Sequence, residues 1–181
     1  DAQESRGLGD VYKRQHFALL NQLTAAPATQ TALVVAASEQ ADRTLLVAQT
    51  VTESIEKMAQ APSARLVNLA GRQRMLSQRL AKNYFLNAAK VESKVVQAQL
   101  VADAADFRQA LQTLKAAPVS TPAIRSELEL ADSQWLFFDS ALRRPADDAG
   151  LSAVATTSER LLGVMDKLTS LYEAALREVL G

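Results

Sequence analysis

Cysteine is absent from the 181 residues of this chain, and histidine occurs once, at His16. The absence of cysteine excludes disulfides, thiol catalysis and zinc–thiolate sites. The sequence shows no glycine-rich phosphate loop and no pairing of a nucleophile with a base, and the acidic stretch at 146–148 has no second acidic cluster with which to hold a metal ion. We therefore expect no catalytic residue, no metal site and no cofactor, and a protein that is not an enzyme.

The chain also has no net charge at pH 7, because 20 Lys and Arg residues balance 20 Asp and Glu residues. Nucleic acids and anionic membrane surfaces attract proteins through a broad basic face, so we expect no nucleic-acid partner. The longest apolar run, ALVVAA at 32–37, is far too short to span a bilayer. Any membrane attachment would therefore depend on an anchor that is missing from this chain.

The first 15 residues, DAQESRGLGDVYKRQ, have no hydrophobic periodicity and do not lead naturally into the residues after them. They resemble translated adapter sequence of the kind found in metagenome-derived sequences, and they contain no signal peptide. We treat residues 1–15 as a non-native leader. On this interpretation the native N-terminus is missing, and the cellular location cannot be inferred from this end.

Glycine and proline are scarce, at 6 and 5 residues, whereas alanine, leucine, glutamine and glutamate are abundant, and this composition favours helices. Between the few breaks, apolar residues recur at spacings of three and four, and no stretch alternates with period two. The pattern predicts an all-α fold: an antiparallel four-helix bundle over residues 63–180, preceded by an extra long helix over about 29–59. Thr121 and Pro122 are typical of an N-cap and a first helical residue, and residues 146–148 are suited to cap the last helix.

The extra helix resembles the last helix of the bundle, which suggests an internal repeat. An offset of 117 residues maps Asp42, Arg43, Leu45, Val47, Thr52 and Glu56 onto Glu159, Arg160, Leu162, Val164, Thr169 and Glu173. We interpret residues 16–60 as the C-terminal part of a truncated first repeat. The alternative is chance similarity between two amphipathic helices.

The first bundle helix carries a cluster of positive charge without any acidic residue between 66 and 85. On a helical wheel, Leu66, Leu69, Leu76, Leu80 and Tyr84 form a core stripe, and Gln73 lies inside it. A buried glutamine needs hydrogen-bond partners. Arg65, Arg72 and Arg79 are spaced by seven residues and flank this stripe, so we expect them to reach solvent from the edge of the bundle.

Arg74 lies about 200° round the helix from Arg72. Around it is a second apolar seam, defined here as Val67, Ala70, Ala81 and Phe85, with Gly71 one turn earlier. Such a seam indicates a second partner surface, as in a homodimer formed through this helix, where Arg74 would meet its own copy. Two like charges buried together need an anion between them, and paired guanidiniums suit a small oxyanion. The alternative is an exposed arginine that pairs with a nearby Asp or Glu.

The motif NLAGRQRMLSQRLAK at 68–82 strongly resembles the signature of the PilJ-type domain, the N-terminal sensor domain of type IV pilus methyl-accepting chemotaxis transducers, and the wider resemblance runs over about 63–176. The family is related to NarX-type nitrate/nitrite sensor domains. The resemblance implies a periplasmic or extracytoplasmic sensor bundle for chemotaxis or signal transduction, which forms a homodimer through its first helix.

The resemblance also implies a ligand and its contacts. The anion, nitrate or nitrite, would lie at the dimer interface, with Arg74 as its principal ligand and Gly71 allowing close approach. Asn68 and Arg72 would be further contributors, and Arg79 is a matched position with a less defined role. The alternative is a periplasmic helical scaffold or partner-binding module that takes no small-molecule ligand.

Overall fold

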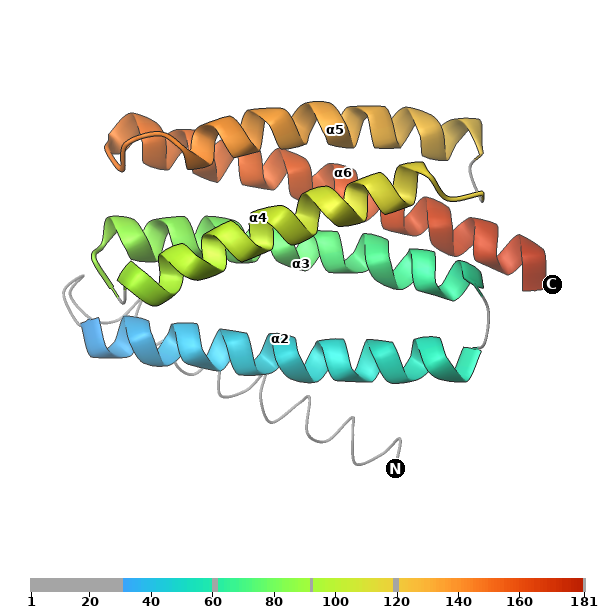
Figure 1. The fold of residues 1–181 in the computed structure, drawn as a ribbon, viewed down its shortest axis with the longest axis horizontal. Coiled ribbons are helices and arrows are strands. Elements are labelled where there is room, and N and C mark those ends of the chain that lie inside the picture. The colour runs from blue at the N-terminus through green and yellow to red at the C-terminus, as the bar shows by residue number, and fades with distance from the viewer. Residues whose placement is uncertain (1–30, 60–61, 92, 119–120, 181) are drawn as a thin grey trace. The chain divides into compact units, whose positions relative to one another are not determined.

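The computed structural model of the protein describes residues 31–59, 62–91, 93–118 and 121–180 (Figure 1). Within these ranges all regular structure is helical, in five helices: α2 (Thr31–Ala59), α3 (Pro62–Ala88), α4 (Ser93–Lys115), α5 (Pro122–Leu142) and α6 (Asp148–Leu180). The predicted all-α fold is therefore confirmed. None of the helices in these ranges is long and apolar enough to cross a membrane. The predicted leader and His16 lie outside the described residues.

The chain divides into two units, one ending at Met58 and the other beginning at Ala59. In the first unit the structure describes α2, close to the helix predicted over 29–59. Leu46, Ile55 and Met58 of α2 are exposed. The internal repeat stays a prediction. Under its offset of 117 residues, Ile55 and Met58 correspond to Tyr172 and Ala175 of α6. Those two residues of α6 are buried, whereas Ile55 and Met58 are exposed.

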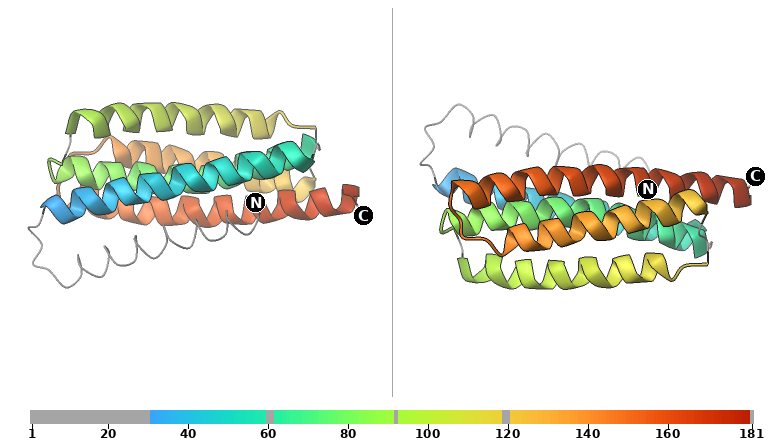
Figure 2. Two further views of the ribbon diagram at one scale, coloured as in Figure 1. Left: turned by 90° about the horizontal axis from the view of Figure 1, so that it is seen from below. Right: turned by 90° about the horizontal axis from the view of Figure 1, so that it is seen from above.

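The second unit is the predicted four-helix bundle. Helix α3 packs against α4 and α6, and α5 packs extensively against α6 and less extensively against α4. Within this unit, α4 runs antiparallel to α3, α5 to α4 and α6 to α5, as the views in Figures 1 and 2 show. The connections are short, so successive helices lie side by side.

Apolar side chains at three- and four-residue spacing form the bundle core. In α3 the predicted stripe is buried at Leu76, Leu80 and Tyr84, and partly buried at Leu66 and Leu69. In the middle of the bundle, Phe107 of α4 stacks on Trp135 of α5 with 4.3 Å between the ring centroids. This stack of aromatic rings joins α4 to α5 across an interface that is otherwise less extensive.

Side-chain caps start the last two helices as the sequence predicts. The hydroxyl of Thr121 accepts a hydrogen bond from the Ile124 N–H at 3.2 Å, and Pro122 is the first residue of α5. The Asp147 carboxylate accepts one from the Gly150 N–H at 2.8 Å at the start of α6. Each cap satisfies a backbone donor that has no partner within the helix.

Gly150 lies at a tight contact between α3 and the loop that precedes α6. The Tyr84 hydroxyl lies 3.1 Å from the Arg144 carbonyl oxygen and 3.0 Å from that of Pro145. A Cβ atom at Gly150 would lie 2.0 Å from the Pro145 oxygen and 2.7 Å from the Tyr84 hydroxyl oxygen. Glycine is therefore required here, because any side chain would displace the loop backbone.

Candidate functional site

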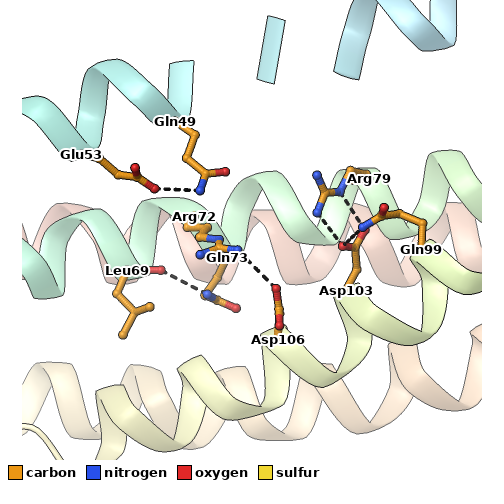
Figure 3. A network of polar contacts seen from close by, with 9 residues as sticks. All are labelled: Gln49, Glu53, Leu69, Arg72, Gln73, Arg79, Gln99, Asp103 and Asp106. Carbon is orange, nitrogen blue, oxygen red and sulfur yellow. Dashed lines mark hydrogen bonds and ion pairs between the residues drawn. The ribbon is translucent and has the colours of Figure 1, made fainter. Parts of the chain in front are cut away.

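Helix α3 presents three of its arginines to two different neighbours. Toward α4, the Arg79 guanidinium donates two hydrogen bonds to the Asp103 carboxylate, from Nε at 2.7 Å and from Nη2 at 2.5 Å. Gln99 donates to the same carboxylate at 2.7 Å. Also toward α4, Arg72 Nη2 donates to Asp106 Oδ2 at 3.2 Å. Figure 3 shows these groups pointing toward one another.

The expectation that Arg79 reaches solvent is wrong. Its side chain is 19 % exposed and that of Asp103 is 1 % exposed, so the two form a largely buried ion pair. The charge of the α3 segment is balanced by carboxylates on other helices, which inspection of the segment alone does not reveal. Arg72 is nearer the surface, yet its Nε atom is buried and has no hydrogen-bond partner among the described residues.

Gln73 is buried in the core stripe, as predicted. Its Nε2 atom donates to the Leu69 carbonyl oxygen at 3.2 Å within α3. Its Oε1 atom is buried and has no partner in the described structure. The predicted need for hydrogen bonds is therefore met for the donor and not for the acceptor, and a buried unpaired acceptor is costly.

Toward α6, α3 presents Gly71 and Arg74. The nearest atom to a Cβ built at Gly71 is Thr169 Cγ2, at 3.9 Å, which is ordinary van der Waals contact. One turn later, Arg74 Nη2 lies 3.2 Å from Asp166 Oδ1, and the two side chains are 44 % and 59 % exposed. This is the exposed ion pair that the sequence left open as an alternative.

The second apolar seam is largely covered by the protein's own bundle. Ala70 and Ala81 belong to the buried core cluster, Val67 packs against it, and Phe85 is the member that remains exposed. The expectation that this whole seam faces a partner is wrong. A bundle helix has two neighbours, here α4 and α6, so its buried arc is wider than a single stripe. The homodimer itself stays a prediction.

The five predicted ligand residues are therefore not gathered on one side of a single copy. Arg72 and Arg79 face α4, Gly71 and Arg74 face α6, and Asn68 lies one turn before Arg72. No group of three or more His, Cys, Asp or Glu residues is placed to hold a metal ion in the described part of the chain.

Sequence reasoning missed the acidic partners, Asp103, Asp106 and Asp166. One of them did leave a signal. Asp103 occupies a core position of α4, since Val96, Leu100, Asp103, Phe107, Ala110 and Leu114 follow alternating spacings of four and three. A carboxylate in such a stripe must be paired to be buried. The positions of Asp106 and Asp166, on partly solvated faces, carry no comparable signal.

Comparison with known proteins supports a single assignment. A model of the type IV pili methyl-accepting chemotaxis transducer N-terminal family matches residues 58–161, which run from the end of α2 into α6. The match covers more than half of the chain and includes all of α3. No curated protein and no solved structure matches the chain.

Proposed function

The chain belongs to the PilJ family of type IV pili chemotaxis transducer N-terminal domains, and on this premise we propose that its bundle senses a small oxyanion, nitrate or nitrite. The anion would bind between two copies of α3 in a homodimer. The family supports a sensor-type helical domain in a periplasmic or extracytoplasmic location. The ligand and the dimer are supported by the residues of α3.

The observation that carries the proposal is the guanidinium of Arg74. It is 44 % exposed, and its partner Asp166 is 59 % exposed, so the pair is open to solvent and weakly held. Gly71, one turn away, adds no side chain that would keep a second helix at a distance. Two such guanidiniums brought together repel each other, and a planar oxyanion between them accepts hydrogen bonds from both.

The neighbouring arginines are less suited to this role. Arg79 is held by both oxygens of a buried carboxylate, so releasing it would leave Asp103 without its charge partner. Arg72 extends toward α4 and pairs with Asp106. We assign Arg74 as the principal ligand, Gly71 as the position of close approach, Arg72 and Asn68 as further contributors, and Arg79 as a structural residue.

The size of nitrate limits the affinity of such a site. Its four heavy atoms, at a ceiling of about 1.5 kcal/mol each, give at most about 6 kcal/mol of binding free energy. The corresponding dissociation constant is on the order of 10–100 µM. A submicromolar constant for nitrate would be incompatible with this kind of site.

Calorimetric titration of the whole chain with nitrate and nitrite tests the proposal. The wild type should give saturable heat with a dissociation constant at or weaker than this limit, and Arg74→Ala should abolish it. Arg143→Ala is a matched control, because Arg143 is also an exposed arginine in an ion pair, with Asp139 of α5, and this variant should bind nitrate as the wild type does. A folded wild-type protein that gives no saturable heat would refute anion sensing.

One observation favours the alternative of a scaffold or partner-binding module. Leu130, Leu136 and Phe137 are large apolar side chains of α5 that remain exposed. Leu130 and Phe137 are seven residues apart and so lie on the same face of the helix, and apolar side chains exposed on one face are a feature of interaction surfaces. If this module is the function, Leu136→Ser with Phe137→Ser should abolish partner capture, whereas Arg74→Ala should leave it intact.

A further inference from the structure

The carboxylate of Asp166 lies beside the Arg74 guanidinium, the group that would bind the anion in the proposed site. Arg74 Nη2 lies 3.2 Å from Asp166 Oδ1, which is a distance that a nitrate oxygen would also adopt. Carboxylate and nitrate are both planar oxyanions and use the same guanidinium donors. The protein thus already holds its own oxyanion at the proposed binding group.

The packing of two helices places Arg74 and Asp166 beside each other. Helices α3 and α6 are antiparallel, and Gly71 lies against Thr169, one turn from the ion pair on each helix. Asp166 is therefore carried on the helix that packs most extensively against α3. Any homodimer that brings two copies of Arg74 together also brings two copies of Asp166 close to the anion.

We propose that Asp166 is an internal competitor for the Arg74 guanidinium and that it makes the site selective for monovalent anions. This inference rests on the proposed function, since it concerns the same anion site. With two arginines and two aspartates the site has no net charge before the ligand binds. Without the carboxylates, the two guanidiniums would attract a divalent anion twice as strongly as nitrate, and the carboxylates cancel that advantage.

Coulomb's law gives the size of the effect. At about 6 Å in water, one unit charge changes the affinity for a monovalent anion about threefold. The two Asp166 carboxylates of a dimer should therefore weaken nitrate binding about tenfold. For a divalent anion such as sulfate the same charges should weaken binding about a hundredfold, since the energy doubles with the charge of the ligand.

The test compares the wild type, Asp166→Asn, Arg74→Ala and a control in calorimetric titrations with sodium nitrate and sodium sulfate at constant ionic strength. The control is Asp132→Asn, which removes the same charge from an ion pair between α5 and α4. Asp166→Asn should bind nitrate about tenfold and sulfate about a hundredfold more tightly than the wild type. Asp132→Asn should match the wild type with both salts.

The outcomes separate this inference from the function on which it rests. If the wild type binds nitrate and Arg74→Ala does not, while Asp166→Asn binds both anions as the wild type does, the anion site stands and the role of Asp166 is overturned. If Asp166→Asn and Asp132→Asn tighten binding equally, the effect is one of overall charge and the role is again overturned. If no variant binds either anion, the anion site fails, and the role of Asp166 fails with it.

Discussion

Asp103 of α4 lies almost completely buried in the bundle and holds the Arg79 guanidinium of α3 through both of its carboxylate oxygens. A buried charge that loses its partner is strongly destabilising, whereas replacing the whole pair by apolar side chains is often close to neutral. The net contribution of this pair to stability is therefore small, but separating its two charges is costly. That cost holds α4 against α3.

Asp103→Ala should lower the free energy of unfolding by about 3–5 kcal/mol, because Arg79 is left largely buried without its counter-charge. Asp106→Ala is the matched control on the same helix. Its pair with Arg72 is 38 % and 50 % exposed, so solvent screening should limit the loss to less than about 1 kcal/mol. Urea unfolding followed by circular dichroism measures both. Equal losses would show that burial of the first pair has no energetic consequence.

Gly150→Ala should destabilise the bundle by about 3 kcal/mol or more, because the new methyl group would overlap the Pro145 carbonyl oxygen and force the loop to move. Gly163→Ala makes the same change in the middle of α6, where a Cβ atom would have no atom of the described residues within 4 Å. There the substitution should stabilise by about 0.5–1 kcal/mol, since glycine is a poor helix residue. Thermal unfolding of the two variants should shift in opposite directions.

Gly71→Ala should separate effects on the stability of a single copy from effects on formation of the proposed dimer. Alanine fits within one copy, because its Cβ atom would be 3.9 Å from Thr169 Cγ2, so unfolding should be unchanged or slightly harder. If a second α3 approaches at this position, the added methyl group should weaken both nitrate binding and dimer formation. Sedimentation velocity with and without saturating nitrate measures the second effect. A wild-type monomer–dimer equilibrium that nitrate leaves unchanged would contradict the model.

Alkaline pH should destabilise the bundle through two tyrosines. Burial raises the pKa of Tyr172 above the ordinary value of 10.0. Burial, and to a smaller extent the nearby Asp147 carboxylate, raises the pKa of Tyr84, while Arg144 acts in the opposite direction. The unfolded chain then loses these protons first, so this part of the stability is complete below about pH 10 and is lost as the pH rises through the folded-state pKa values.

Unfolding free energies measured in urea at about pH 8 and about pH 10.5 check this expectation. The unfolding free energy of the wild type should fall from the lower pH to the higher one. That of Tyr172→Phe should fall by less, since phenylalanine has no proton to release. Tyr172→Phe should be less stable at the lower pH, because the buried hydroxyl donates to the Leu114 carbonyl oxygen at 3.2 Å. A wild-type protein that is equally stable at both values would contradict the raised pKa values.

Much of the fold could be predicted because its determinants are local. Thr121 and Pro122 mark the start of α5 wherever the helix packs, and the spacing of Leu76, Leu80 and Tyr84 is a property of α3 alone. These signals need no knowledge of the neighbouring helix. They identify the helices and the buried face of each.

The candidate site was less predictable because it depends on pairs of helices. A wheel of α3 shows that Arg72 and Arg74 point in different directions, and it does not show that α4 supplies Asp106 and α6 supplies Asp166. Likewise Ala70 and Ala81 have the character of an interface, and only the packing shows that their own bundle covers them. The register between helices, which a single-helix pattern does not contain, determined each of these outcomes.

The stack of Phe107 on Trp135 gives the protein an internal optical reporter. Trp135 is the single tryptophan of the chain and is buried between α4 and α5, whereas Arg74 belongs to the opposite pair of helices, α3 and α6. The fluorescence of Trp135 should therefore be emitted at short wavelength and should resist quenching by acrylamide until the bundle unfolds. Tryptophan emission can follow unfolding of every variant described above, and an anion that binds Arg74 without rearranging the core should leave it unchanged.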